Sequence, residues 1–187
     1  EMLEMIKKFF THQEIIYIWK RMIGTGMIGG KTIGMLLARA ILRNHNKRWI
    51  DILEWHDSFF IGSDVYYSFL VNNNCWMIRQ RQKNPDTFLD GVDEARDRIL
   101  NGVFPDYILK RFSDMLDYYG QSPIIVRSSS LLEDNFGNAF AGKYESVFCA
   151  NQGGHKERLE QFLNAVRAVY ASSMSREALE YRAKRGV

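Results

Sequence analysis

The sequence is poor in the residues that build covalent and metal-stabilised frameworks. Its 187 residues include only two cysteines, Cys75 and Cys149, and three prolines. The cysteines lie far apart and show neither a CxxC motif nor a Cys/His spacing, so neither a disulfide framework nor a zinc site is indicated. With no internal repeat and no low-complexity segment in the sequence, the composition is that of an ordinary globular protein.

The sequence also lacks a targeting signal, a long apolar run and a concentration of charge. No apolar run approaches the roughly 20 residues that span a bilayer, so we expect a cytoplasmic protein without a membrane partner. The net charge is +3, and no face or tail concentrates it, so we expect no nucleic-acid partner. We interpret the densest basic piece, residues 79–83, as a solvated turn.

The length and the ends of the chain bound its organisation. A chain of 187 residues can bury a core and forms one domain or two small ones. The sequence begins with Glu1 inside a helical pattern and stops soon after another helical pattern. We therefore expect it to be a piece of a longer polypeptide.

Hydrophobic periodicity predicts a mixed α/β architecture. Segment 15–23 is ambiguous between helix and strand. The predicted helices are 2–10, 32–42, 64–71, 92–101, 105–119, one from Lys156 and one from near Ser173 or Ser175. The predicted strands are 59–61, 123–127 and 143–149.

The most informative segment begins after Pro123. An apolar run, residues 124–126, predicts a buried strand that ends on Arg127, and three serines and then Glu133 and Asp134 follow. An arginine at a strand end is poorly placed for core packing but can meet a phosphate with its bidentate fork. The segment predicts part of a nucleotide site.

A second segment, residues 24–32, is rich in glycine and ends on Lys31 and Thr32. A Walker A loop would need a glycine at position 25, where the sequence has threonine. The dinucleotide fingerprint GxGxxG matches Gly24, Gly26 and Gly29. That fingerprint also needs an acidic residue at the end of a second strand, and Asp51, the nearest, follows a polar stretch. A glycine-rich helix-entry turn with a surface lysine is the remaining alternative.

The order of the motifs resembles a known family. Gly29-Gly30-Lys31 opens a helix, and segments 59–66, 102–105, 123–134 and 140–146 follow. This set resembles the nucleotide-binding region of phosphoenolpyruvate synthases and pyruvate phosphate dikinases, which rifampin phosphotransferases and glucan water dikinases share. The resemblance extends from about Gly24 to Val187.

The resemblance implies the fold and the reaction. The fold would be α/β (α+β), an incomplete ATP-grasp-like N-terminal lobe with a mixed sheet and flanking helices. Residues 1–23 would be a helical lead-in, and residues 24–187 the nucleotide-binding fragment. In that family ATP phosphorylates a histidine on a separate domain, which passes the phosphoryl group to an acceptor.

The resemblance also assigns roles to individual residues. Lys31 and Arg127 would contact ATP phosphates and neutralise charge during transfer. Gly142 and Ser146 would belong to a loop that covers the phosphates, although threonine is usual where Ser146 stands. The family also favours other residues at Ala139 and Lys143. The nucleotide-binding set predicted in this way consists of Lys31, Arg127, Gly142, Ser146, Gly30 and Ser128.

Other parts of the family's site have no counterpart in this sequence. The adenine-facing strand and the magnesium-binding pair of the family come after the point where this sequence stops. We therefore expect ATP as ligand, no metal residues here, Mg²⁺ only in the full-length protein, and an inactive isolated fragment. The expected partner is a phosphohistidine domain, while the oligomeric state is not predicted. Two alternatives stay open: a Rossmann-like dinucleotide-binding domain of an oxidoreductase, and a non-catalytic regulatory ATP-grasp module.

Overall fold

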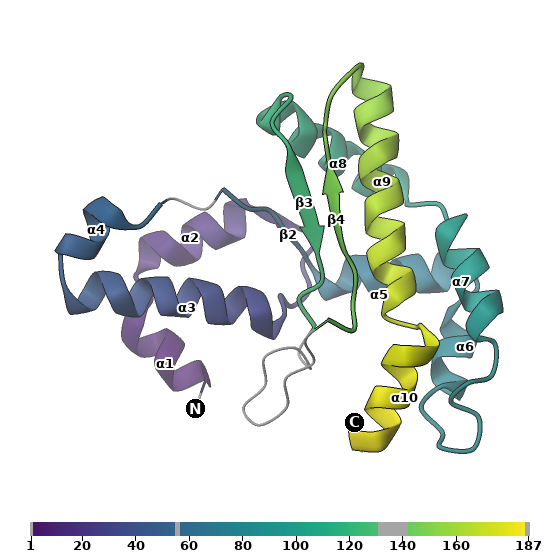
Figure 1. Cartoon of the computed structure of the whole chain (residues 1–187). Helices are drawn as coiled ribbons and strands as arrows, with labels where there is room; N and C mark the ends of the chain where they lie inside the picture. Colours follow the sequence, from purple (N-terminus) through teal and green to yellow (C-terminus); the bar gives the residue numbers. More distant parts are fainter. Residues whose placement is uncertain (1, 55–56, 131–141, 186–187) are drawn as a thin grey trace. The chain divides into compact units, whose positions relative to one another are not determined.

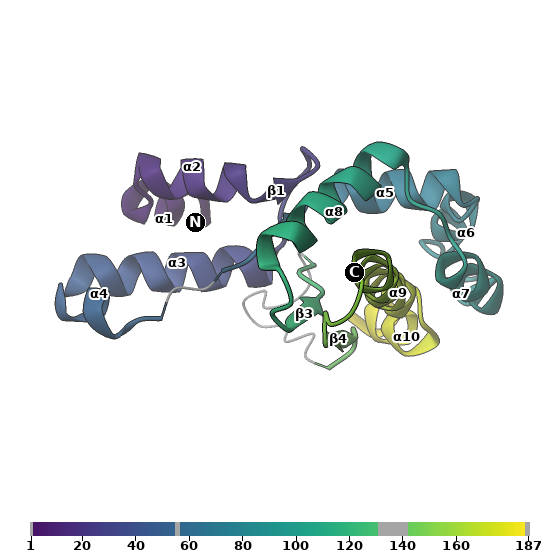
Figure 2. The same ribbon diagram turned by 90° about the horizontal axis from the view of Figure 1, so that it is seen from above.

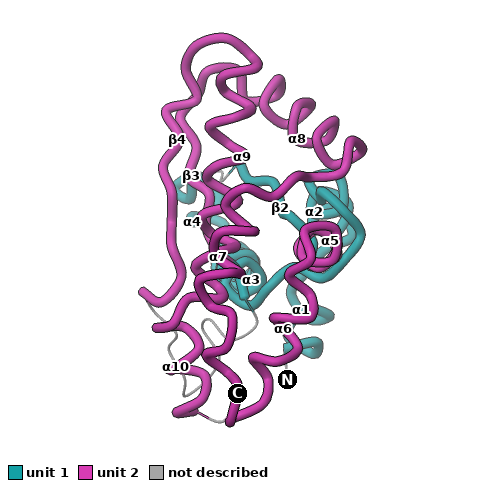
Figure 3. Tube along the Cα trace, turned by 90° about the vertical axis from the view of Figure 1, so that its right-hand side faces the viewer, with its two compact units in different colours: residues 1–63, 129–140 teal, residues 64–128, 141–187 magenta. Residues whose placement is uncertain are grey.

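The computed structural model of the chain describes residues 2–54, 57–130 and 142–185. These residues form a helix-rich α+β structure with small two-stranded sheets (Figure 1). The chain divides into two compact units, coloured separately in Figure 3. Unit 1 comprises residues 1–63 and 129–140, and unit 2 comprises residues 64–128 and 141–187.

Unit 1 pairs two short parallel strands that are separated in sequence by helices. Met22 is the register partner of Phe60, and Ile23 is that of Ile61. The ambiguous segment 15–23 is therefore helical up to Lys20 and extended only at its end. The elements of unit 1 are α1 (Met2–Phe9), α2 (His12–Lys20), β1 (Met22–Ile23), α3 (Gly30–His45), α4 (Arg48–Ile52) and β2 (Phe60–Ile61).

Unit 2 contains the second sheet and the larger part of the core. Its strands come from segments that we predicted as extended, and its helices match the predicted periodicity within a few residues. Two short helices, α4 in unit 1 and α6 in unit 2, were not predicted. The elements of unit 2 are α5 (Ser63–Asn72, whose first residue belongs to unit 1), α6 (Trp76–Arg81), α7 (Val92–Leu100), α8 (Asp106–Tyr119), β3 (Ile124–Arg127), β4 (Ser146–Cys149), α9 (His155–Ser172) and α10 (Arg176–Arg185).

Strands β3 and β4 form an antiparallel ribbon that helix α9 packs against (Figures 1 and 2). Directly opposed residues of such a ribbon share a face. One face holds the less exposed pairs Ile124–Cys149 and Val126–Val147. The other face holds Ile125 opposite Phe148, which are 43% and 81% exposed, and Arg127 opposite Ser146. The ribbon thus has one covered face and one exposed face.

Aromatic rings form the core of unit 2. Phe69, Phe104, Phe112 and Phe162 are all buried and come from different parts of the chain. Their ring centroids lie 4.5 Å apart for Phe69–Phe104, 5.4 Å for Phe104–Phe112 and 5.0 Å for Phe112–Phe162. Because tilted and edge-to-face contacts at such distances are favourable, these rings tie α5, α8 and α9 together.

Buried polar side chains fix the turn that leads into β3. The Asn151 side-chain amide donates to the carbonyls of Gly120 and Ser122, at 2.9 and 2.8 Å. The Arg158 guanidinium donates to the carbonyls of Leu116 and Gly120, at 3.1 and 2.6 Å. These bonds satisfy carbonyls at the C-terminus of α8, where intrahelical donors run out. They therefore help to determine where β3 begins.

The structure corrects three expectations. In the described residues, a parallel pair and an antiparallel pair stand in separate units where we expected one mixed sheet. The run 124–127 is not a buried strand, because Ile125 and Arg127 lie on the exposed face of the ribbon. Segment 79–83 is not a solvated turn: helix α6 extends to Arg81, and Gln82 is 6% exposed. Sequence periodicity could not distinguish these cases, since they depend on which neighbours cover a segment.

The division into units does not coincide with the boundary that we predicted at Gly24. Unit 1 contains the lead-in helices α1 and α2 together with α3 and β2. The division into residues 1–23 and 24–187 therefore remains a prediction. No helix in the described ranges combines the length and apolar character needed to cross a membrane.

The buried tyrosines of unit 2 predict a loss of stability at alkaline pH. Burial raises the pKa of Tyr66 and Tyr170 above the ordinary value of about 10. The folded state then keeps protons that the unfolded state releases, so this stabilisation is complete below pH 10 and declines above it. We expect the free energy of unfolding to fall by at most about 1.4 kcal/mol per pH unit and per group.

Urea titrations at pH 8 and pH 10.5 would measure this decline. Tyr66→Phe should reduce the difference between the two pH values, because phenylalanine has no proton to release. Tyr107→Phe, at a tyrosine that is 61% exposed, serves as the matched control and should leave the difference as it is in the unaltered chain. A decline that is equally steep in Tyr66→Phe would contradict the assignment to Tyr66.

Candidate nucleotide-phosphate site

The N-terminus of helix α3 is organised by a residue almost a hundred positions away. Gly29 is the N-cap and provides no side chain to cap the helix. The amide of Thr32 donates instead to the hydroxyl of Ser129, at 2.9 Å. A helix N-terminus presents backbone amides and a positive dipole end, which together favour an anion. Gly30 and Lys31 are the first two residues of this helix.

Gly29 is needed because the backbone of Ser129 passes directly over it. A Cβ atom at position 29 would overlap the carbonyl of Ser129. The contact therefore requires a residue without a side chain. By contrast, Gly34, one turn into the same helix, has nothing within 4 Å of an added Cβ. The glycine of the entry turn thus has a steric role that the mid-helix glycine lacks.

In unit 2 the strand pairing brings two of the predicted residues together. Arg127, the last residue of β3, stands opposite Ser146, the first residue of β4. Both side chains are exposed and share one face of the ribbon. A guanidinium and a hydroxyl so placed can bind the oxygens of one phosphate group, with the cation supplying charge-assisted bonds.

Gly142 precedes β4 and has the left-handed backbone conformation, with a φ of 71°. Nothing lies within 4 Å of an added Cβ, so the conformation, and not crowding, favours glycine there. The ammonium of the next residue, Lys143, lies 5.7 Å from the ring centroid of Tyr181. The rest of the predicted covering loop, including Phe140 and Ala141, and the carboxylates Glu133 and Asp134 lie outside the described residues.

The predicted site residues fall into two groups. Gly30 and Lys31 belong to unit 1, while Arg127, Ser128, Gly142 and Ser146 belong to unit 2. The positions of the units relative to each other are not determined, so the prediction that Lys31 and Arg127 face one phosphate stays untested. Within unit 2, the register joins Arg127 to Ser146.

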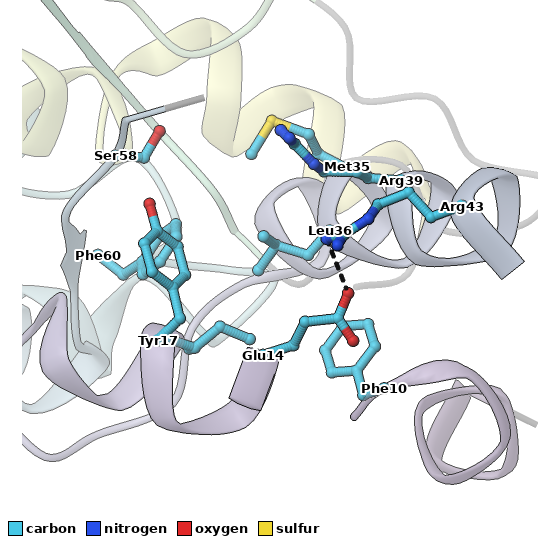
Figure 4. A pocket seen from close by; sticks show the side chains of 10 residues that line it. Phe10, Glu14, Tyr17, Met35, Leu36, Arg39, Arg43, Ser58 and Phe60 are labelled. Atoms are coloured by element: carbon cyan, nitrogen blue, oxygen red, sulfur yellow. Dashed lines mark ion pairs between the residues drawn. The ribbon is translucent and has the colours of Figure 1, made fainter. Parts of the chain in front are cut away.

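Neither a metal-binding cluster nor the small cavity described below adds a residue to the candidate site. In the described ranges, no group of three or more His, Cys, Asp or Glu side chains could hold a metal ion. A small cavity of about 40 Å³ lies in unit 1 among α2, α3 and β2 (Figure 4). Its wall includes Tyr17, Leu36 and Phe60, and an ion pair of 3.5 Å between Glu14 and Arg43 borders it. Ligand pockets usually measure about 300–1,000 Å³, so this cavity is too small for a nucleotide.

The comparisons with known proteins agree with the arrangement of these motifs. A sequence model of the family described as pyruvate phosphate dikinase, AMP/ATP-binding domain, matches residues 25–187. The matched region is thus of a class of domains described as binding AMP or ATP. The chain belongs to this family of pyruvate phosphate dikinase AMP/ATP-binding domains, as the resemblance indicated. No curated protein and no solved structure matches the chain significantly.

Sequence reasoning missed the role of Ser129. We assigned nucleotide binding to its neighbour Ser128, and that assignment remains a prediction. Serine is a favoured capping residue, but capping residues are normally sought immediately before a helix. A cap supplied from 97 positions along the chain leaves no local signal.

The contact between Gly29 and Ser129 gives a prediction about stability. Gly29→Ala should destabilise unit 1 by about 1–3 kcal/mol, because the added methyl group displaces the Ser129 backbone. Ser129→Ala should cost about 1 kcal/mol through loss of the cap. The matched control Gly34→Ala should stabilise the helix by up to about 1 kcal/mol.

Chemical denaturation of the three variants, followed by circular dichroism, would measure these differences. Equal tolerance of alanine at positions 29 and 34 would show that the Ser129 segment does not pass over Gly29.

Proposed function

We propose that this chain is the ATP-binding part of an ATP-dependent phosphotransferase related to phosphoenolpyruvate synthase and pyruvate phosphate dikinase. In the full-length protein, ATP would phosphorylate a histidine on a separate domain, and the fold around the nucleotide would be ATP-grasp-like. The proposal rests on family membership over residues 25–187 and on the chemistry of two anion-binding elements. A cytoplasmic location, and a phosphohistidine domain as partner, stay predictions that accompany it.

The observation that carries the proposal is the pairing of Arg127 with Ser146 at one end of an exposed ribbon face. The planar guanidinium presents several donors in a fixed fork that matches phosphate geometry. The hydroxyl opposite can donate to a second oxygen of the same group. Because the strand pairing holds both backbones, the two side chains are arranged before a ligand arrives, which limits the entropy lost on binding.

Unit 1 would supply the second element through the N-terminus of α3. The first-turn amides of Gly30 and Lys31 stand where the helix dipole favours an anion, and Lys31 adds a full positive charge. Ser129, which caps this helix, follows Arg127 by only two residues in sequence. The same short peptide therefore joins the arginine of one element to the cap of the other. Lys31 and Arg127 would neutralise charge on the transferring phosphoryl group.

Magnesium does not enter the chemistry assigned to this chain. Mg²⁺ needs several oxygen ligands in octahedral geometry. The described ranges contain no group of three or more His, Cys, Asp or Glu side chains that could hold a metal ion, and Mg²⁺ in the full-length protein stays a prediction. We therefore assign to these residues only the binding and orientation of phosphate groups.

The dinucleotide-binding alternative has one feature in its favour and one against it. Strands β1 and β2 are parallel and flank α3, as a dinucleotide-binding unit requires. However, Asp51 lies in helix α4, not at the end of a strand. An adenine-nucleotide family also matches the chain, so ATP is the better-supported ligand. A regulatory module without transfer activity would share the site and differ only in whether a phosphoryl group leaves it.

Removal of either cation tests the site. In the full-length protein, Lys31→Met and Arg127→Met should each weaken ATP binding by about 1.5–3 kcal/mol, the range for hydrogen bonds to charged groups. The controls Lys47→Met and Arg96→Met remove the same charges from exposed positions in the same units and should change the affinity little.

Isothermal titration or NMR titration of each variant with ATP would give the dissociation constants. Folding should be unaffected, since both side chains lie at the ends of secondary-structure elements. ATP affinity that is unchanged in both site variants would contradict the assignment.

We also expect the 187-residue chain by itself to bind ATP weakly at best and to transfer no phosphoryl group. The family resemblance assigns the adenine-facing strand and the metal ligands to another lobe, so most of the binding energy would be missing. Calorimetry and an assay with radiolabelled ATP on this chain would test the expectation. Tight Mg²⁺–ATP binding or measurable hydrolysis would mean that the site is complete in these residues and has been placed wrongly.

A further inference from the structure

The two residues before Ser146 are held by side chains of helices α9 and α10. The backbone amide of Glu145 donates to the hydroxyl of Ser172, at 3.0 Å. The side chain of Tyr144 is buried and lies within hydrogen-bonding range of the guanidinium of Arg182. Since Arg182 can only donate, the phenol oxygen of Tyr144 is the acceptor. Segment 144–145 is therefore fixed at two successive positions.

The two groups that hold this segment, the Ser172 hydroxyl and the Arg182 guanidinium, both make contacts where α9 ends. Ser172 is the last residue of α9, and its hydroxyl donates to the carbonyl of Val169, at 2.7 Å. Its lone pairs thus remain available for the Glu145 amide. Arg182 lies in α10, is 7% exposed, and also donates to the carbonyl of Ser173, at 2.9 Å. One guanidinium therefore connects the end of α9 with Tyr144.

A neighbouring pair in the same layer provides an internal comparison. The hydroxyl of Ser173 donates to the carbonyl of Tyr170, at 2.7 Å, and lies 2.8 Å from the hydroxyl of Tyr66. Because Ser173 has a single proton, Tyr66 donates in the second bond. This pair joins α5 to the C-terminal end of α9. Like the Ser172 and Tyr144 contacts, it consists of hydroxyl hydrogen bonds, but its partners are Tyr66 and Tyr170.

We propose that Ser172 and Arg182 are positioning residues for nucleotide binding, which act through Glu145 and Tyr144 to hold Ser146 opposite Arg127. The inference rests on the proposed function, since it assigns a purpose to the position of Ser146. In this role neither Ser172 nor Arg182 would need to contact the phosphate itself.

The physical reason is the weakness of the ribbon. A two-stranded antiparallel pair is at best marginally stable without further support. Ser146 is the first residue of β4 and follows closely on Gly142, whose backbone conformation is one that few other residues adopt. Strand pairing constrains the end of such a ribbon less than its middle. Two hydrogen bonds immediately before Ser146 add a constraint on the side from which the chain arrives.

The test compares two matched pairs of variants in the full 187-residue chain. Ser172→Ala and Tyr144→Phe each remove one contact to segment 144–145 and leave the rest of the side chain in place. Ser173→Ala and Tyr66→Phe instead remove the hydroxyl groups that bond to each other and to the carbonyl of Tyr170. Urea denaturation shows whether the two pairs lose similar stability. ATP titration and the NMR signal of the Arg127 side-chain Nε–H then report on the site.

We expect the first pair to weaken ATP binding by about 3- to 10-fold, comparable to the loss of one hydrogen bond, and to shift the Arg127 signal. The control pair should change the affinity less than about 2-fold and leave that signal in place. If the two pairs changed the ATP affinity and the Arg127 signal equally, Ser172 and Arg182 would have only a general structural role. That result would overturn the proposal. So would an unshifted Arg127 signal or unchanged ATP affinity in the first pair. If the unaltered 187-residue chain bound no ATP, titration of the full-length protein would test the proposed function, and the Arg127 signal would still decide whether segment 144–145 orders the ribbon.

Discussion

The antiparallel pairing of β3 with β4 is the interaction on which the nucleotide chemistry of this chain depends. It places Arg127 opposite Ser146 although 18 residues separate them in sequence. The pairing alternates side chains between two faces, so the contacts that bury Val126 and Cys149 against α9 also direct Arg127 and Ser146 away from it. A shift of one residue in register would exchange these faces and bury the cation.

Several buried polar contacts support this register from both ends of the ribbon. Asn151 and Arg158 satisfy the carbonyls of the turn before β3, and Ser172 and Arg182 hold the segment before β4. Such groups are costly to bury unless they are paired, so each restricts the backbone to conformations in which its partner is in place. Helix α9 takes part at both ends, because Arg158 lies in its first turn and Ser172 is its last residue. The aromatic core around Phe112 and Phe162 holds this helix in unit 2.

In unit 1, a contact between residues distant in sequence fixes the N-terminus of helix α3. Helix α3 needs an N-cap, yet a side chain at Gly29 would collide with the passing backbone of Ser129. The Ser129 hydroxyl takes over the capping role. The entry to α3 is therefore specified by a glycine and a distant serine together. Neither residue has a clear meaning when it is considered alone, which explains why the glycine-rich segment matched several motifs incompletely.

The sequence by itself determined most of the helices, the strand ending on Arg127 and the family. Periodic apolar residues have to face a core, and an ordered set of motifs is specific even where each motif is weak, so Lys31 and Arg127 could be singled out without coordinates. Only the tertiary structure decided that Ile125 is exposed, that Ser129 caps α3 and that Ser172 and Arg182 hold the approach to Ser146. These features arise from hydrogen bonds and packing between residues distant in sequence. A local pattern records the propensity of a segment, but not which partner will lie against it.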